Sequence, residues 1–147
     1  MKFVPERSKL CSFCGLSEDI FHMYTTCARL KGIFQSVEQL ASGITGKNVD
    51  RRAFIFGLDP KAGKANKLCN FIFNLAKKAN LITRSNKEEQ KGLTDIDFVF
   101  KILLKARMKT DFSYYKVIRN INKFKREWLI NDILGQITIN QELTFNF

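Results

Sequence analysis

Apolar side chains recur at three- and four-residue intervals over most of the chain, the spacing that places them on one face of an α-helix. We expect Gly43 to end the helix over residues 28–42 and Asp95 to cap the helix that begins there. The last predicted helix follows that one after little or no break. The chain is therefore predicted to be mainly α, a helical bundle. The predicted helices cover residues 28–42, 64–84, 95–106 and roughly 113–130.

Three shorter segments break this helical pattern. Residues 54–56 form an apolar run between two arginines and a turn signal, which is typical of a strand or of a plug into the core. The polar stretch 85–92 is predicted to be a loop. Residues 137–147 alternate between apolar and polar, which predicts a small C-terminal β-hairpin with Asn140 and Gln141 in its turn.

Length and composition agree with a folded domain of ordinary size. The 147 residues are 45% hydrophobic and include 14 Phe, enough to bury a core. We expect residues 1–42 and 43–147 to form two parts packed as one unit. No uninterrupted apolar run reaches the roughly 18 residues of a membrane span, and the N-terminus lacks an apolar signal segment. An intracellular protein of the nucleus or cytoplasm, away from membranes, is therefore expected.

The net charge of +11 favours a polyanionic partner, RNA and/or DNA. Residues 61–126 carry 17 basic and five acidic side chains, against eight and six in residues 1–60 and none and three in residues 127–147. The surplus therefore belongs to the central helices.

Basic residues on these helices follow helical spacing of their own. In the predicted helix 113–130, an apolar stripe through Phe124 and Trp128 lies opposite a stripe of cations, and a second stripe occupies the preceding helix. Like charges at this spacing destabilise a helix by roughly 0.2–0.5 kcal/mol per pair, so their repetition without acidic partners favours phosphate binding. The predicted nucleic-acid-binding residues are Lys101, Lys105, Lys109, Lys116, Arg119, Lys123 and Arg126.

The alternative for these cations is a solvated helix face with no ligand. Tyr114 and Tyr115 lie beside them, either as stacking platforms for bases or as half-buried edges of the core. Nothing in the sequence predicts readout of particular bases.

Cys11, Cys14, His22 and Cys27 are spaced as ligands of a metal ion. Two Cys separated by two residues and followed by Gly15 form a tight knuckle, and His22 and Cys27 can complete a tetrahedron. Three thiolates and one imidazole suit a closed structural Zn²⁺ site that leaves no position for a catalytic water. The alternative is a group of buried thiols and a core His. The fourth cysteine, Cys69, falls on an apolar helix face and is predicted to be a core residue.

The string CSFCGLSEDIFHMYTTCARL resembles the zinc-binding region at the C-terminal end of reverse transcriptases from non-LTR (LINE-type) retrotransposons. The resemblance continues more loosely through RRAFIFG and FSYYKVIRNINKFKREWLINDIL, and so covers most of the chain. It implies a segment that holds template RNA or target DNA near the polymerase domain of the same polyprotein. The matching residues are Cys11, Cys14, Gly15, Glu18, His22 and Cys27.

The catalytic motifs of that family are absent from the sequence, so we expect no enzyme. Its polymerase site carries paired aspartates, whereas Asp95 and Asp97 are separated by Ile96. The single His22 is assigned to the metal, which leaves no base for a His-dependent nuclease or a Ser/His/Asp triad. The chain begins where the full polyprotein would be nearly finished, as a truncated element without independent function would. A protein-interaction or structural zinc module is the other expectation.

Overall fold

The computed structural model describes residues 30–85 and 95–147. The predicted zinc ligands Cys11, Cys14, His22 and Cys27 lie outside the described residues, as does all but the first residue of the predicted loop 85–92.

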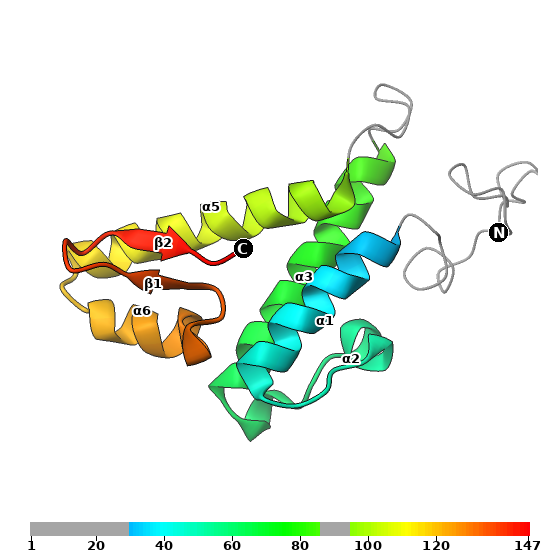
Figure 1. Ribbon diagram of the computed structural model, residues 1–147, viewed down its shortest axis with the longest axis horizontal. Coiled ribbons are helices and arrows are strands. Elements are labelled where there is room, and N and C mark those ends of the chain that lie inside the picture. The colour runs from blue at the N-terminus through cyan, green and yellow to red at the C-terminus, as the bar shows by residue number, and fades with distance from the viewer. Residues whose placement is uncertain (1–29, 86–94) are drawn as a thin grey trace, which may run out of the picture.

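Helices make up most of the described chain, as predicted, and a small antiparallel hairpin closes it (Figure 1). Helices α1 and α3 lie side by side, and α5 crosses them and extends beyond them. The next helix, α6, and the hairpin pack beside the far half of α5. The elements are α1 Lys31–Thr45, α2 Arg51–Phe56, η4 Pro60–Ala62, α3 Lys64–Ser85, α5 Ile96–Val117, α6 Ile121–Trp128, η5 Ile130–Asp132, β1 Gly135–Ile137 and β2 Leu143–Phe145.

The first helix ends three residues later than predicted. Gly46 takes the left-handed conformation, with φ at 71°, and its N–H donates to the carbonyl of Ser42. Glycine adopts this conformation without a Cβ penalty. Gly43 instead lies inside α1, where a Cβ would stand 2.6 Å from Cδ1 of Ile133. The prediction that the helix ends at Gly43 is therefore wrong. The absence of a side chain at Gly43 instead lets α1 pack closely against Ile133.

Residues 54–56 belong to the short helix α2, so the strand interpretation is wrong and the plug interpretation is right for one side chain. The Asp50 carboxylate caps the helix by accepting from the N–H of Ala53. Phe54 is only 4% exposed and meets the rings of Phe34 and Phe73 edge to face, at centroid distances of 5.0 and 5.8 Å. Because a six-residue helix presents one narrow face, its neighbour Phe56 remains exposed.

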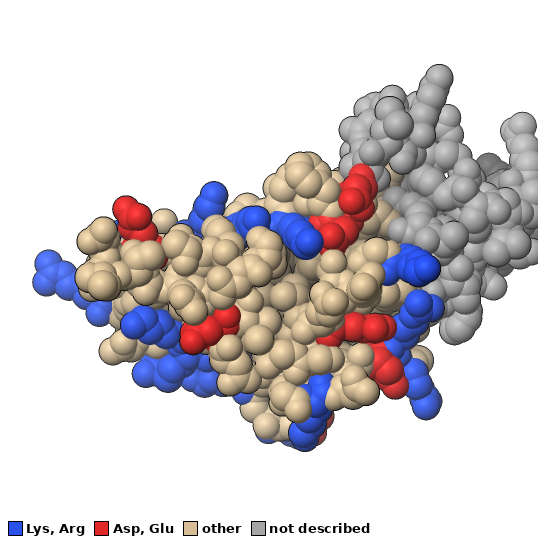
Figure 2. All heavy atoms as spheres, viewed as in Figure 1, with Lys and Arg blue, Asp and Glu red and all other residues tan. Residues whose placement is uncertain are grey.

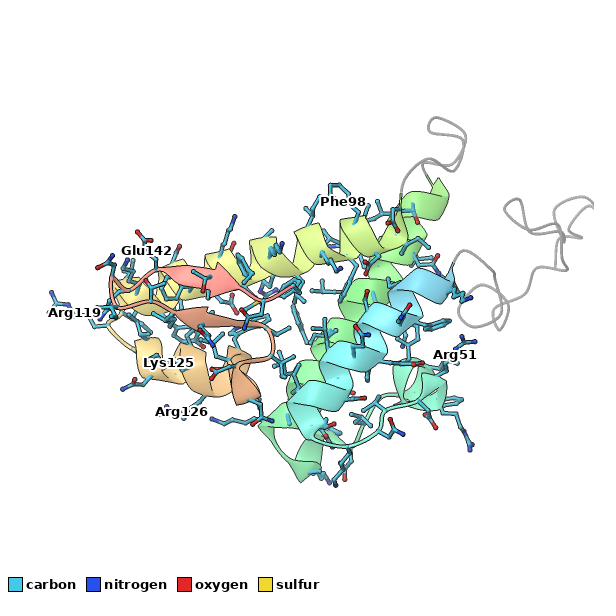
Figure 3. The ribbon with its side chains drawn as sticks, in the orientation of Figure 1. Arg51, Phe98, Arg119, Lys125, Arg126 and Glu142 are labelled. Atoms are coloured by element: carbon cyan, nitrogen blue, oxygen red, sulfur yellow. The ribbon has the colours of Figure 1, made fainter. Side chains whose placement is uncertain are left out.

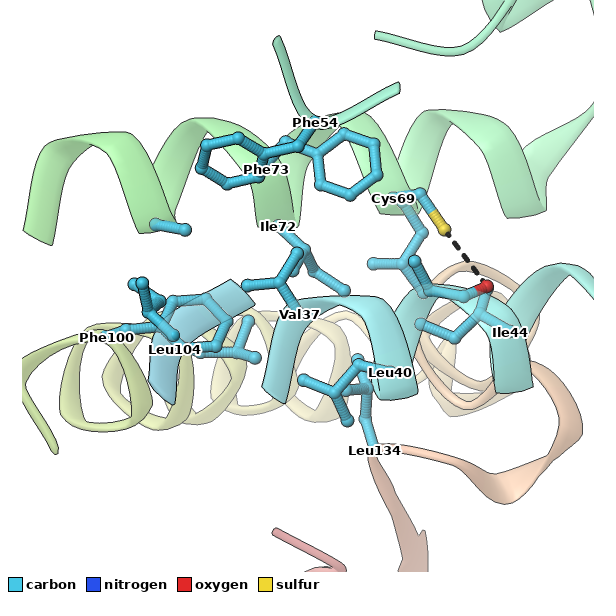
Figure 4. Close-up of a cluster of buried hydrophobic side chains, with 14 of the residues drawn as sticks. Val37, Leu40, Ile44, Phe54, Cys69, Ile72, Phe73, Phe100, Leu104 and Leu134 are labelled. Carbon is cyan, nitrogen blue, oxygen red and sulfur yellow. Dashed lines mark hydrogen bonds between the residues drawn. The ribbon is translucent and has the colours of Figure 1, made fainter. Parts of the chain in front are cut away.

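A continuous apolar core joins α1, α3 and α5 (Figure 4). Cys69 is fully buried within it, and its Sγ lies 3.9 Å from the carbonyl oxygen of Ala41. Burial raises the pKa of this thiol to about 11, so the group is neutral at pH 7. The prediction that Cys69 is a core residue is confirmed. The largest fully buried side chains of the described core include Ile33, Ile72, Phe73, Phe100, Leu104 and Leu134.

Helix α5 begins after Asp95, whose carboxylate accepts from the N–H of Asp97, as predicted. It continues to Val117, and the chain then turns through Arg119, at φ 57°, before α6. The predicted single helix over 113–130 is therefore wrong. Because of the turn, Phe124 and Trp128 are buried as predicted, whereas Val117 is 80% exposed.

The C-terminal hairpin is confirmed and begins two residues before the predicted segment. Gly135 pairs with Phe145 and Ile137 with Leu143, and Gln141 in the connecting turn has φ at 61°. Before the hairpin, the Asn131 amide donates to the carbonyls of Gly43 and Ile44, which ties η5 to the end of α1. None of the helices within the described ranges is long and apolar enough to cross a membrane.

Candidate nucleic-acid interface

The predicted zinc site depends on the N-terminal segment. Over residues 30–85 and 95–147, no three His, Cys, Asp or Glu side chains are placed to hold a metal ion together. The ligand set Cys11, Cys14, His22 and Cys27 remains a prediction.

The three predicted lysines of α5 lie on one side of the helix, where they already have partners. Lys101 forms an ion pair with Asp97 at 3.0 Å, so the expectation of cations without acidic partners is wrong for this residue. The Lys105 ammonium lies 5.6 Å from the ring centroid of Phe145, and that of Lys109 lies 5.8 Å from the same ring. The C-terminal hairpin therefore covers part of the lysine stripe that the sequence pattern predicts to be available for phosphate binding.

The other four predicted cations do not share one helix face, which corrects the predicted stripe. Lys116 is in the last turn of α5, where its ammonium donates to the carbonyl of Gln141 at 3.4 Å. Arg119 lies in the turn between the helices. Only Lys123 and Arg126 are on α6. The turn separates residues that a continuous helix would align.

On α6 a compact group of cations faces solvent. Phe124 and Trp128 face inward, while Lys123, Lys125 and Arg126, here called the α6 cations, are exposed. Lys125 and Arg126 project away from the helix (Figure 3), and Lys and Arg side chains gather in this region of the surface (Figure 2). Within the described part of the chain, no carboxylate lies within 4 Å of these three cations. The sequence pattern missed Lys125 because it lies off the stripe of Lys123 and Arg126.

A cleft of about 330 Å³ opens between the start of α3, the middle of α5 and α6. We call it the basic cleft. The sequence pattern singled out only Lys123 of its cations. The sequence did carry a signal for two of the others, Lys64 and Lys67, which lie at the start of α3. The helix dipole favours acidic residues in the first turn, but the first turn of α3 contains none. The cleft is lined by the cations Lys64, Lys67, Arg107 and Lys123, the carboxylates Asp111 and Glu127, and the apolar side chains Leu68, Phe71 and Trp128.

Asp111 organises one wall of the basic cleft. Its Oδ1 accepts from Nε of Arg107 and its Oδ2 from Nε1 of Trp128, each at 3.1 Å. The carboxylate therefore joins α5 to α6 and holds the arginine in place. The Arg107 guanidinium carbon also lies 5.2 Å from the ring centroid of Phe71, which adds a cation–π contact to α3.

Comparison with known proteins finds one informative similarity. No protein-family model matches the chain, and no solved structure matches it. Over 132 residues the chain is 26% identical to a Xenopus laevis protein, the transposon TX1 uncharacterized 149 kDa protein, and the match covers 87% of this chain. It covers only 10% of that protein's length. The similarity supports a LINE-type retrotransposon origin.

The two tyrosines beside the cations have different surroundings. Tyr115 is half-buried, and its hydroxyl donates to Oε1 of Glu127 at 2.9 Å. This hydrogen bond, with smaller effects of burial and nearby carboxylates, raises the pKa of Tyr115. Tyr114 is 60% exposed. The core-edge interpretation therefore fits Tyr115, whereas the ring of Tyr114 is accessible to a ligand.

Proposed function

We propose that this chain is a non-catalytic nucleic-acid-binding segment of a retrotransposon protein. It holds template RNA or target DNA near a polymerase domain elsewhere in the same polyprotein. The observation that carries the proposal is the group of α6 cations, exposed together and without an ion-paired carboxylate in the described residues. The similarity to a transposon protein adds support.

Phosphate binding gives these cations a physical role. Lys123 and Arg126 lie three residues apart, a spacing at which like charges on a helix repel each other, and a phosphate backbone relieves that repulsion. Binding also releases the counterions condensed on the nucleic acid, which supplies most of the sequence-independent affinity. The predicted partner is therefore recognised by charge rather than by base identity.

A salt-titrated binding assay tests the proposal. For the full chain and a single-stranded oligonucleotide, log K should fall with log salt concentration, at about −0.7 for each phosphate neutralised. The triple variant Lys123→Gln, Lys125→Gln, Arg126→Gln should bind more weakly and show a flatter slope.

A triple variant with the same loss of charge is the control. Lys47→Gln, Arg52→Gln and Lys78→Gln remove two lysines and one arginine that are exposed outside α6 and the basic cleft. This control should keep most of the affinity and slope. Equal losses in both triple variants, or no binding by the natural chain at low salt, would contradict the proposal.

Structural zinc at Cys11, Cys14, His22 and Cys27 is the second part of the proposed function. Its support is the donor set itself, because three thiolates and one imidazole at this spacing suit a closed tetrahedral site. Elemental analysis should find one zinc per chain, and Cys14→Ser should lose it. A metal-free natural chain would contradict this part.

A protein-interaction module is the second candidate function. Phe98 and Ile102 lie one turn apart on α5 and are 63% and 49% exposed, and Phe98 points outward from the bundle (Figure 3). Large apolar side chains grouped in this way are typical of protein contacts. If this function dominates, Phe98→Ser should weaken binding to the polymerase part of the polyprotein while leaving nucleic-acid binding intact.

A further inference from the structure

The basic cleft contains an arginine that is held in place and still has free donors. Asp111 accepts from Nε of Arg107, and Phe71 lies against the guanidinium. The Arg107 side chain nevertheless remains 54% exposed. Its four terminal N–H groups have no hydrogen-bond partner in the described part of the chain.

We propose that the basic cleft seats a phosphodiester group of single-stranded nucleic acid. Arg107 grips the phosphate with its terminal N–H groups, and Lys64, Lys67 and Lys123 surround it. Asp111 is a positioning residue that acts through Arg107. This inference rests on the proposed function and deepens it, because it names the chemical group and the strand form that the protein holds.

The chemistry of the lining favours a phosphodiester. A guanidinium presents parallel donors that match two phosphate oxygens, and such charge-assisted pairs are stronger than neutral hydrogen bonds. Arg107 loses less conformational freedom on binding because Asp111 and Phe71 already orient it. The three lysines, drawn from α3 and α6, add positive charge from the other sides.

The carboxylates of the cleft do not cancel this attraction. Both oxygens of Asp111 accept hydrogen bonds, from Arg107 and Trp128, and one oxygen of Glu127 accepts from Tyr115. Four cations and two carboxylates line the cleft, which leaves two positive charges in excess. One phosphodiester carries a single negative charge, so the cleft remains attractive to it.

The shape of the cleft favours a single strand over a duplex. Its apolar wall consists of Leu68, Phe71 and Trp128, side chains that suit a sugar or base edge next to the phosphate. The volume of about 330 Å³ falls at the lower end of the range for small-ligand sites, roughly 300–1,000 Å³. A flexible strand can turn a nucleotide into such a cleft, whereas a regular duplex keeps its bases stacked.

The central experiment compares Arg107→Gln with Lys78→Gln, an equal loss of charge on an exposed residue of α3 outside the cleft. Binding of an oligothymidylate of about 12 nucleotides is measured at low salt with the full chain. Arg107→Gln should weaken binding about tenfold, as expected for lost charge-assisted hydrogen bonds. Lys78→Gln should change it less than twofold.

A conservative variant separates geometry from charge. Arg107→Lys keeps the positive charge but loses the planar set of donors, so it should recover only a small part of the lost affinity. Full recovery would overturn the role of the guanidinium.

If an Arg107 variant loses helix content, Lys67→Gln is the second test, because this exposed side chain lines the cleft and can be removed without touching the core. It should weaken binding about threefold.

The outcomes distinguish the inference from the proposed function. If the natural chain binds no oligonucleotide, the proposed function fails. If it binds with a steep salt dependence but Arg107→Gln behaves like Lys78→Gln, only the cleft is overturned. If a duplex of the same length competes as well as the single strand, the preference for a single strand is overturned.

Discussion

Individual residues determine how closely the elements of this protein approach one another. Asp111 is the clearest example, since one carboxylate accepts from Arg107 on its own helix and from Trp128 on α6. Glu127 acts similarly by accepting from Tyr115 across the same helix pair. Hydrogen bonds to charged groups are worth about 1.5–3 kcal/mol, enough to fix the orientation of a short helix. The two acidic residues of the cleft are therefore structural partners of its basic and aromatic side chains.

The pH dependence of Tyr115 tests the contact with Glu127. The raised pKa means that the folded state retains the phenol proton, so the stabilisation is present below the ordinary value of 10.0 and is lost as the pH rises through the folded pKa. Absorbance titration of the natural chain minus Tyr115→Phe should give a midpoint above 10.0. Glu127→Gln should move that midpoint down. No change in Glu127→Gln would show that the hydrogen bond is not the main cause.

Gly135 is expected to be sensitive to a single added methyl group. It is buried at the start of β1, where a Cβ would collide with the backbone carbonyl oxygen of Thr144. Because backbone atoms cannot move aside as a side chain can, Gly135→Ala should destabilise the fold by about 1–3 kcal/mol in denaturant unfolding. Gly32→Ala, in α1 with no heavy atom of the described residues within 4 Å of its Cβ position, should be neutral or stabilising by up to about 1 kcal/mol.

Among the elements, the break between α5 and α6 has the largest consequence. A continuous helix would place Lys116, Arg119, Lys123 and Arg126 on one face, whereas the turn at Arg119 reverses the chain. Phe124 then packs against Phe112 at a centroid distance of 5.2 Å, and Trp128 against Phe71 at 5.3 Å. Burial of these aromatic rings stabilises the reversed arrangement, and it brings Lys123 to the basic cleft.

The tie between η5 and α1 gives a test at the scale of elements. Asn131 has φ at 56° and donates to two carbonyls at the end of α1. Asn131→Gly keeps the left-handed conformation and loses the hydrogen bonds, so the free energy of unfolding should fall by about 1 kcal/mol. Asn131→Ala should cost about 1–2 kcal/mol more, because alanine disfavours this conformation. Equal losses in the two variants would indicate that the hydrogen bonds alone matter.

The described residues by themselves bury one continuous apolar core. Its members run from Leu30, the residue before α1, to Leu134 before the hairpin. We therefore expect the helical core to persist when zinc is removed, while the metal stabilises the N-terminal knuckle.

Zinc removal tests this division of roles. A strong chelator should remove the metal and leave the main thermal unfolding transition, followed by circular dichroism, in place. The Cys14→Ser variant should behave like the chelated protein. Loss of most helical signal on chelation would show that the knuckle supports the core.

The sequence by itself determined the helical class, the position of α3, the cap at Asp95 and the terminal hairpin. Each follows from local chemistry: apolar spacing along the chain, a carboxylate next to free N–H groups, and alternation at period two. The apolar run at residues 54–56 is also a local pattern. It fits one turn of helix as well as a short strand, so it could not decide between the two. The zinc ligands were also predicted from spacing alone, and they stay a prediction.

Only the tertiary structure decided where the charges meet. The turn at Arg119 has a positive φ in a non-glycine residue, which is stable here because the following aromatic side chains reach the core. The hairpin covers Lys105 and Lys109 because its register places Phe145 beside them. Lys67, Arg107 and Lys123 come from three helices, so no periodicity within one segment could bring them together. The sequence determined that this protein is basic and helical, and packing between distant segments decided which cations surround the cleft.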